Sequence, residues 1–337
     1  MVNWGVAGCG WVARDFAVPA IQASKNGQLV ALFDQDRDAL ARIGAPDAFA
    51  TTDLAAFLAT PGLGAVYVAT PNHAHRFLVE ACAHAGLAVL CEKPMAINLA
   101  DARAMVVACN GAGTRYATAF DQRFHAAHRA MAAAVAQGRL GAVTALRIVY
   151  ACWVGESFAA DNWRIDPTRA GGGAMIDLAP HGLDLAAMIL GAPITEIAAL
   201  GQTRVQPYAR AGVDDGAMLI GRTATDVLIT LHVAYNNPET LPRRRLEIVG
   251  TLGQIVAENT MGQEAGGTVT FIDAENGQAS PMTIDGIERS PFLNQIEAFA
   301  AAVEGAAFGF TPEQDLHTME LLMRAQVMIA SPTTRAA

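Results

Sequence analysis

The chain has 337 residues, of which 52% are hydrophobic and 16% are charged. This is long enough for about two domains and too apolar for a disordered chain. Its 23 basic and 32 acidic residues give a formal net charge of -9, and apart from Arg243–Arg245 the basic residues are scattered, which excludes an extended nucleic-acid surface. We expect those three arginines, which alternate along a strand pattern, to form salt bridges.

The amino-terminal sequence MVNWGVAGCG has no cationic start, no apolar segment of signal length and no small-residue cleavage site. Apolar runs elsewhere are broken by charges or glycine, so we expect a cytoplasmic protein that has no membrane partner. The cysteines are odd in number and form no C-x-x-C pair, which indicates buried thiols and no zinc or disulfide framework. They are Cys9, Cys82, Cys91, Cys109 and Cys152.

Up to about residue 120, short apolar segments alternate with helical patterns. This alternation is typical of βαβ units and predicts a Rossmann-type, doubly wound parallel sheet in a domain of residues 1–121. The expected strands cover residues 3–7, 29–34, 65–70, 87–92 and 114–120, and helices are expected from Trp11, Asp36, Asn72 and about Asn98.

From residue 122 to 337 the pattern predicts a second α/β domain with a large, open and mostly antiparallel sheet. A helix to about Gly138 leads into a β-type run at 143–153, and a further helix is centred on 177–190. The remaining strands are expected at 195–202, 216–222, 226–235, 243–250 and 253–258, followed by helices at about 291–303 and 312–329.

The first expected strand runs into Gly8-Cys9-Gly10-Trp11-Val12-Ala13, a G-x-G-x-x-A pattern that opens a helix. Gly8 permits a tight turn, Gly10 leaves room for a pyrophosphate, and the helix start at Trp11 and Val12 offers free N–H groups to phosphates. Asp34 ends the second strand, where a carboxylate accepts hydrogen bonds from the ribose hydroxyls of adenosine and repels a 2′-phosphate. The pattern therefore predicts NAD(H), although Arg37 leaves NADP(H) open.

Two further motifs follow apolar strands, at the edge where ligands bind in open parallel sheets. They are ATPNHAH, which ends at His75, and CEKP, which ends at Pro94. With GCGWVA and with GGGAMIDLAPHGLD at 171–184, these motifs make the chain resemble the glucose-fructose oxidoreductase, inositol dehydrogenase and rhizopine-catabolism family, Gfo/Idh/MocA. The resemblance covers most of the chain.

The resemblance implies a nicotinamide-dependent oxidoreductase that acts on a sugar, a sugar derivative or a cyclitol. It places the catalytic lysine at Lys93 and the D-x-x-x-H pair at Asp177 and His181. His181 is then the general acid or base, and Lys93 stabilises negative charge on the substrate oxygen. The further cofactor residues are Thr70, Pro71, Asn72, His75, Glu92 and Gln122, of which Glu92 is expected to hydrogen-bond the nicotinamide ribose. The substrate residues beside Lys93, Asp177 and His181 are Trp163 and Arg164.

The helix that carries Asp177 and His181 leaves two arrangements open. In a continuous helix, Asp177, His181 and Asp184 share one face, where a metal site is a minor alternative. If the helix starts near Pro180 instead, Asp177 lies on the approach to it. The glycines at 171–173 favour a close approach to a ligand.

Three further expectations concern function and association. A dihydrodiol- or biliverdin-type reaction, or a non-catalytic dinucleotide-sensing role, is the alternative function. The family resemblance and the open apolar sheet favour a homodimer or homotetramer. His125 and His128 are expected on a solvated or interface face of their helix.

Overall fold

The computed structural model describes residues 1–159, 162–206 and 213–330. The chain packs as two compact units: Met1–Asp121 with Phe292–Met319, and Gln122–Pro291 with the chain from Glu320 onward. The chain thus crosses into the second unit at residues 121 and 122, and it returns to the first for residues 292–319. The predicted domain ranges, 1–121 and 122–337, do not contain this return, and residues 331–337 lie outside the described residues.

The sheet of the first unit contains six strands, and every neighbouring pair is parallel. The strands are β1 (Val2–Ala7), β2 (Gly27–Phe33), β3 (Phe49–Thr51), β4 (Ala65–Val68), β5 (Ala88–Glu92) and β6 (Tyr116–Ala119). Their order is β3-β2-β1-β4-β5-β6, the order of the doubly wound dinucleotide-binding fold. The predicted Rossmann sheet is confirmed, and the short edge strand β3 is an addition to it.

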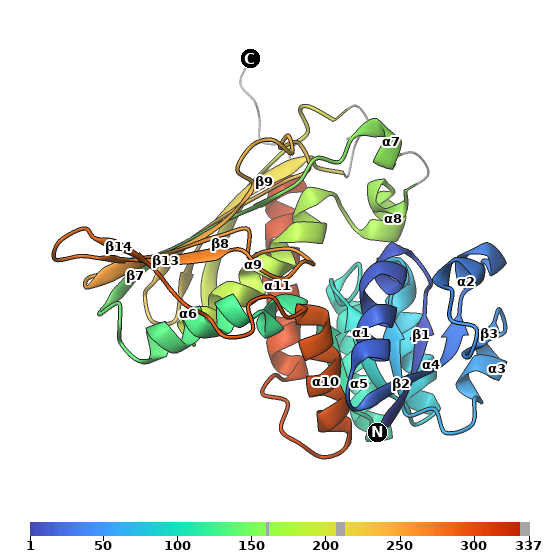
Figure 1. The fold of residues 1–337 in the computed structure, drawn as a ribbon. Coiled ribbons are helices and arrows are strands. Elements are labelled where there is room, and N and C mark those ends of the chain that lie inside the picture. The colour runs from blue at the N-terminus through green and yellow to red at the C-terminus, as the bar shows by residue number, and fades with distance from the viewer. Residues whose placement is uncertain (160–161, 207–212, 331–337) are drawn as a thin grey trace. The chain divides into compact units, whose positions relative to one another are not determined.

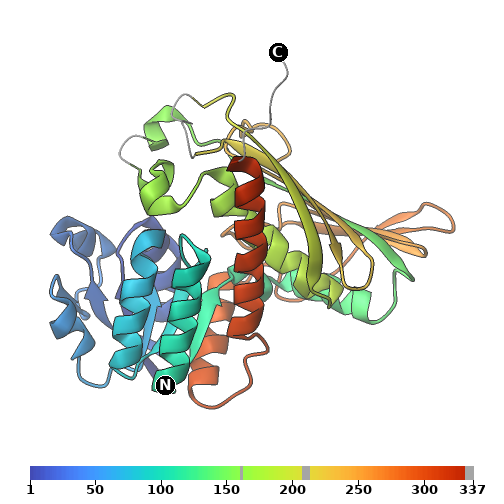
Figure 2. The ribbon, with the colours of Figure 1, turned by 180° about the vertical axis from the view of Figure 1, so that it is seen from behind.

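Helices cover both faces of this sheet (Figures 1 and 2). Figure 1 shows α1 and α10 on the near face, and Figure 2, from behind, shows α4 and α5 on the opposite face. Asp36 and Asn98 cap α2 and α5 with their side chains, as expected where a helix leaves N–H groups unsatisfied. The segments are η1 (Ala13–Ala17), α1 (Val18–Ala23), α2 (Arg37–Ile43), α3 (Leu54–Leu58), η2 (Asn72–Ala74), α4 (His75–His84), α5 (Leu99–Ala112), α10 (Pro291–Val303) and α11 (Pro312–Ala330), which continues into the second unit.

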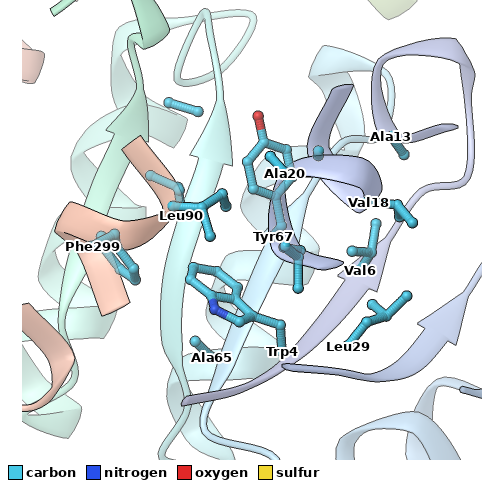
Figure 3. Close-up of a cluster of buried hydrophobic side chains, with 14 of the residues drawn as sticks. Trp4, Val6, Ala13, Val18, Ala20, Leu29, Ala65, Tyr67, Leu90 and Phe299 are labelled. Atoms are coloured by element: carbon cyan, nitrogen blue, oxygen red, sulfur yellow. The ribbon is translucent and has the colours of Figure 1, made fainter. Parts of the chain in front are cut away.

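The core of the first unit is completed by a helix from the far end of the chain. Trp4, Tyr67 and Leu90 lie together on the sheet, and Phe299 of α10 packs against the indole of Trp4 with ring centroids 5.7 Å apart (Figure 3). Ile296 is likewise fully buried in this cluster. Burial of large apolar side chains therefore holds the returning segment in the first unit.

The second unit is built on a sheet of eight strands. They are β7 (Val143–Ala151), β8 (Ile194–Gln202), β9 (Gly216–Thr223), β10 (Leu228–Ala234), β11 (Arg244–Gly250), β12 (Gly253–Glu258), β13 (Thr268–Asp273) and β14 (Ala279–Pro281). They lie in the order β14-β13-β12-β11-β7-β10-β9-β8, in which β7 and β10 are parallel and the other named pairs antiparallel. The predicted mostly antiparallel sheet is confirmed.

One face of this sheet packs against a long apolar helix, α9 (Ala174–Leu190), which passes through Pro180 without ending. Asp177 and His181 are therefore on one continuous helix, and the alternative of a helix starting near Pro180 is wrong. Among the described residues, the segment Pro167–Leu190 has the length and apolar composition of a membrane span, but 78% of its most apolar window is buried inside the protein. The other segments are η3 (Asp121–Phe124), α6 (Ala126–Ala136), α7 (Glu156–Ala159), η4 (Trp163–Ile165) and α8 (Pro167–Ala170).

The opposite face of the sheet exposes apolar side chains. Strand alternation directs Leu200, Met218, Ile220 and Leu228 outward from β8, β9 and β10, and each is more than half exposed. The arginine run lies along and beside β11. Arg243 pairs with Glu239 and Arg245 pairs with Glu247 and Glu258, as predicted, whereas the Nε of Arg244 is buried and has no hydrogen-bond partner among the described residues.

Candidate functional site

The glycine-rich loop between β1 and the first helix contains one glycine that the fold requires and one that has free space beside its Cα. Gly8 has a φ of +94°, and a Cβ there would lie 2.6 Å from the backbone carbon of Ala69, so only glycine fits. A Cβ on Gly10 would meet no atom of the described residues within 4 Å. The fold therefore does not require glycine at position 10, whereas the close approach of a phosphate to the backbone does require it. Trp11 and Val12 begin the helix that follows Gly10.

Asp34 is fixed next to this loop. Its Oδ2 accepts a hydrogen bond from the backbone N–H of Cys9 at 2.7 Å, and its Oδ1 accepts one from Asp36 at 2.9 Å. Burial, together with the negative charge of Asp34, raises the pKa of Cys9 to about 12, which makes this thiol unreactive. Arg37 is exposed at the start of α2.

The loop after β4 presents a hydroxyl and a buried amide. The Oγ1 of Thr70 is buried and has no hydrogen-bond partner among the described residues, so its contact with a cofactor stays a prediction. Pro71 starts the 3-10 turn that contains the buried Asn72. His75 has no exposed surface, and its ring nitrogens lie 3.0–3.1 Å from the carbonyl oxygens of Thr70, Pro94 and Met95. These contacts make His75 a link between two loops, and its contact with a cofactor stays a prediction.

At the end of β5, Glu92 and Lys93 lie beside a tyrosine that the sequence reasoning missed. The hydroxyl of Tyr67 donates a 2.6 Å hydrogen bond to Oε1 of Glu92, and the backbone N–H of Lys93 donates to Oε2 at 3.2 Å. Burial and the charge of Glu92 raise the pKa of Tyr67 well above its usual value, so the phenol stays protonated. One sheet therefore has all of these groups at or just after the carboxyl ends of its strands: Gly8, Gly10, Asp34, Thr70, Glu92 and Lys93.

In the second unit, two tyrosines contact the predicted catalytic residues of α9. The hydroxyl of Tyr235 donates to Oδ2 of Asp177 at 2.8 Å, and the ring of Tyr150 meets the imidazole of His181 edge to face at 5.5 Å. Burial, with the charge of Asp177, raises the pKa of Tyr235 well above its usual value. This phenol therefore remains a donor and keeps the Asp177 carboxylate in place.

The predicted substrate residues Trp163 and Arg164 form a stacked pair in η4. The guanidinium carbon of Arg164 lies 4.4 Å from the centre of the Trp163 ring, and both residues are half-buried. The positive charge of Arg164 lowers the pKa of Tyr235 and so opposes the effect of Asp177. Arg164 thus acts electrostatically on the phenol that holds Asp177.

The start of α9 is anchored by a buried aspartate far along the chain. Asp214 accepts hydrogen bonds from the backbone N–H groups of Gly173 at 3.0 Å and Met175 at 2.8 Å, which would otherwise be unsatisfied. Burial raises the pKa of Asp214 to about 6. A Cβ on Gly173 would lie 2.0 Å from the carbonyl oxygen of Asp214. The close approach expected at glycines 171–173 is therefore, at Gly173, an approach to the protein's own backbone.

A buried ion pair joins η3 to the same helix. Arg123 donates to Asp184 through Nε, 3.0 and 2.9 Å from the two carboxylate oxygens, and through Nη2 at 2.5 Å. Since Arg123 binds both oxygens of Asp184, a metal at Asp177, His181 and Asp184 would have to displace a guanidinium. We find no cluster of metal-binding side chains among the residues the structure describes.

The neighbouring histidines correct a prediction. His125 and His128 have no exposed surface, and burial lowers their pKa values to about 4 and about 3. They lie inside the chain's own core, so the solvated or interface face expected for them is wrong. His128 contacts the carbonyl of Gln122 at 3.0 Å and the hydroxyl of Thr260 at 3.1 Å. The side-chain amide of Gln122 donates to the carbonyl of Gly262 within the second unit, and its contact with a cofactor stays a prediction.

A sequence signal existed for two of the missed residues. Tyr150 and Tyr235 stand at or just after the carboxyl ends of β7 and β10, the one parallel pair in the described part of this sheet, and ligands bind at such ends. Asp214 carried no local signal, because its partners are distant in sequence.

Comparison with known proteins agrees with these motifs. Residues 2–120 match the family model "Oxidoreductase family, NAD-binding Rossmann fold", and residues 128–256 match "GFO/IDH/MocA C-terminal domain". The chain is 32% identical to 1,5-anhydro-D-fructose reductase of Ensifer adhaerens, over 90% of this chain and 89% of the relative. It is 30% identical to D-xylose 1-dehydrogenase (NADP(+)) 2 of Haloferax volcanii, over 95% and 94%.

The fold is similar to that of aldose-aldose oxidoreductase from Caulobacter crescentus, with a TM-score of 0.86, 22% identity and 97% of both chains covered. The family matches span most of the chain, in the order that the glycine-rich loop, the E-K-P motif and the D-x-x-x-H helix predict. The protein therefore belongs to the Gfo/Idh/MocA oxidoreductase family and carries its NAD-binding Rossmann domain.

Proposed function

We propose that the protein is an NAD(P)-dependent oxidoreductase that transfers a hydride between nicotinamide and a CH–OH carbon of a sugar, a sugar derivative or a cyclitol. The observation that carries the proposal is the open space at Gly10 beside the fixed carboxylate of Asp34, which suits a pyrophosphate and an adenosine ribose. The names of the two sequence relatives, a sugar reductase and a sugar dehydrogenase, support this substrate class.

The proposed reaction needs a bound nicotinamide dinucleotide, and the chain supplies the residues that would hold it. When bound, the nicotinamide dinucleotide supplies the hydride donor or acceptor. The residues proposed to hold it are Gly8, Gly10, Trp11, Val12, Asp34, Thr70, Pro71, Asn72, His75, Glu92, Lys93 and Gln122.

The proposed chemistry requires a proton acceptor and a group that stabilises charge. His181 takes the proton of the reacting hydroxyl in oxidation and returns it in reduction, since an imidazole nitrogen can both accept and donate a proton. Lys93 stabilises the negative charge that develops on the substrate oxygen. Asp177, held by Tyr235, binds a neighbouring hydroxyl or orients the imidazole, and Trp163 and Arg164 offer a ring face and hydrogen-bond donors to a polyol.

The cofactor preference is tested by parallel fluorescence titrations with NADH and NADPH at one ionic strength. We propose that NADH binds more tightly, because the Asp34 carboxylate repels a 2′-phosphate. Tighter binding of NADPH would instead make Arg37 the phosphate partner, as the NADP(+) in the name of the Haloferax relative would suggest. If neither dinucleotide bound, the proposed function would be refuted.

The catalytic assignment is tested with His181→Ala and with the matched variant His84→Ala, an exposed histidine on α4. Loss of a general acid or base is expected to lower turnover by about 100-fold or more, with cofactor affinity nearly unchanged. His84→Ala should match the wild type. Near wild-type turnover by His181→Ala would remove the assignment. Dinucleotide binding without turnover of any sugar, cyclitol, dihydrodiol or tetrapyrrole would favour a sensing role.

We further propose that copies of the chain associate through the open sheet face. Its outward apolar side chains, Leu200, Met218, Ile220 and Leu228, form a surface of the kind that a homodimer or homotetramer covers. Light scattering that gave a monomer mass at micromolar concentration would count against this.

We also propose a cytoplasmic location, since all five cysteines are free and four of them are buried.

A further inference from the structure

The buried phenol of Tyr67 makes a short polar contact at the dinucleotide site that the proposed function does not use. Tyr67 lies on β4 with no exposed surface, and its hydroxyl reaches the carboxyl edge of the sheet (Figure 3). There it donates the 2.6 Å hydrogen bond to Oε1 of Glu92. A hydrogen bond of this length to a carboxylate is of the strong, charge-assisted kind.

The surroundings of Tyr67 leave the phenol only one role. Burial and the charges of Glu92 and Asp121 each oppose ionisation of the phenol, so it keeps the one proton that it can donate. That proton is directed to Glu92, whose second oxygen accepts from the backbone N–H of Lys93. The Glu92 carboxylate is therefore held from both sides, by a side chain of one strand and by the backbone of the next residue.

We propose that Tyr67 is a positioning residue of the dinucleotide site, which fixes the carboxylate of Glu92 for the hydroxyls of the nicotinamide-side ribose. This inference rests on the proposed function. When a buried group such as Tyr67 already holds the carboxylate of Glu92 in place, cofactor binding does not have to restrict the rotamers of Glu92, and the affinity is not reduced by that loss of entropy. Tyr67 itself touches neither substrate nor cofactor.

The test compares Tyr67→Phe with Tyr116→Phe, a matched control in the same sheet. Tyr116 is also a buried tyrosine, but its hydroxyl lies 3.3 Å from Thr118 and is not bonded to a residue of the proposed site. Three ligands divide the cofactor into parts: NADH, ADP-ribose, which keeps the second ribose, and ADP, which lacks it. Affinities are measured by calorimetry, with NADH also followed by fluorescence.

Tyr67→Phe is expected to weaken NADH and ADP-ribose by about tenfold, the scale of one hydrogen bond to a charged group, and to leave ADP within about twofold. Tyr116→Phe should leave all three affinities within about twofold. In a Glu92→Ala background, Tyr67→Phe should cause no further loss, because residues that act as one unit are not additive.

Two outcomes would overturn the positioning role. Equal weakening of all three ligands by Tyr67→Phe would indicate a structural effect on the whole unit, and unchanged affinity for NADH would show that Glu92 needs no anchor. Wild-type protein that bound none of the three ligands would refute the proposed function itself, and with it this inference.

Discussion

The buried ion pair between Arg123 and Asp184 offers a direct test of what holds α9 in the second unit. The side chains are only 2% and 6% exposed, and both carboxylate oxygens receive N–H donors. In Arg123→Met, Asp184 remains buried without its cation, and such a break costs about 3–5 kcal/mol. At a urea m-value of about 3 kcal/mol/M, the unfolding midpoint should fall by about 1–1.7 M.

The assay is urea unfolding followed by circular dichroism and by tryptophan fluorescence, with two companions. Arg147→Met removes the solvent-exposed ion pair that Arg147 of β7 forms with Glu247 of β11, and it should cost at most about 1 kcal/mol. The double variant Arg123→Met/Asp184→Leu removes both charges and should recover most of the lost stability. The reasoning is refuted if Arg123→Met is no less stable than Arg147→Met, or if the double variant is no more stable than Arg123→Met.

Three other predictions address the site and the core. Gly10→Ala should keep the wild-type melting temperature, since a Cβ meets open space there, but weaken dinucleotide binding by about tenfold or more; a lowered melting temperature with unchanged binding would contradict this. Gly173→Ala should lower the melting temperature, because its Cβ would collide with Asp214, and unchanged stability would show that the helix start can shift. His125 and His128 have folded pKa values of about 4 and about 3, below the ordinary value of 6.5, so the stability they contribute is present above pH 6.5 and is lost as pH falls through those values. The raised pKa of Asp214 offsets part of this loss. The melting temperature should therefore change less between pH 7 and about 4 in His128→Gln than in the wild type.

Much of the fold was predictable because its signals are local. The alternation of apolar strands with helical patterns predicts the parallel sheet, and the turn at Gly8 is specified by a conformation that glycine adopts easily. The return of α10 to the first unit was not predictable from its pattern. An amphipathic helix shows that one face is buried, but not which core receives it.

The candidate site divides in the same way. The motifs around Gly10, Asp34, Glu92 and Lys93 could be found by spacing, because each follows the end of a strand. The buried histidines could not, since the hydroxyl that contacts His128 belongs to Thr260, 132 residues away. A helical pattern with histidines looks the same whether solvent or a buried hydroxyl faces them.

The sequence by itself determined the dinucleotide-binding loop, the two-part α/β organisation and the helix that carries His181. Only the tertiary structure decided what those groups touch: Tyr235 reaches Asp177 from 58 residues along the chain, and Asp214 reaches the start of α9 from 41. The physical reason is that buried polar groups must be paired, and their partners are chosen by sheet register and helix packing. Neither is encoded in any single segment.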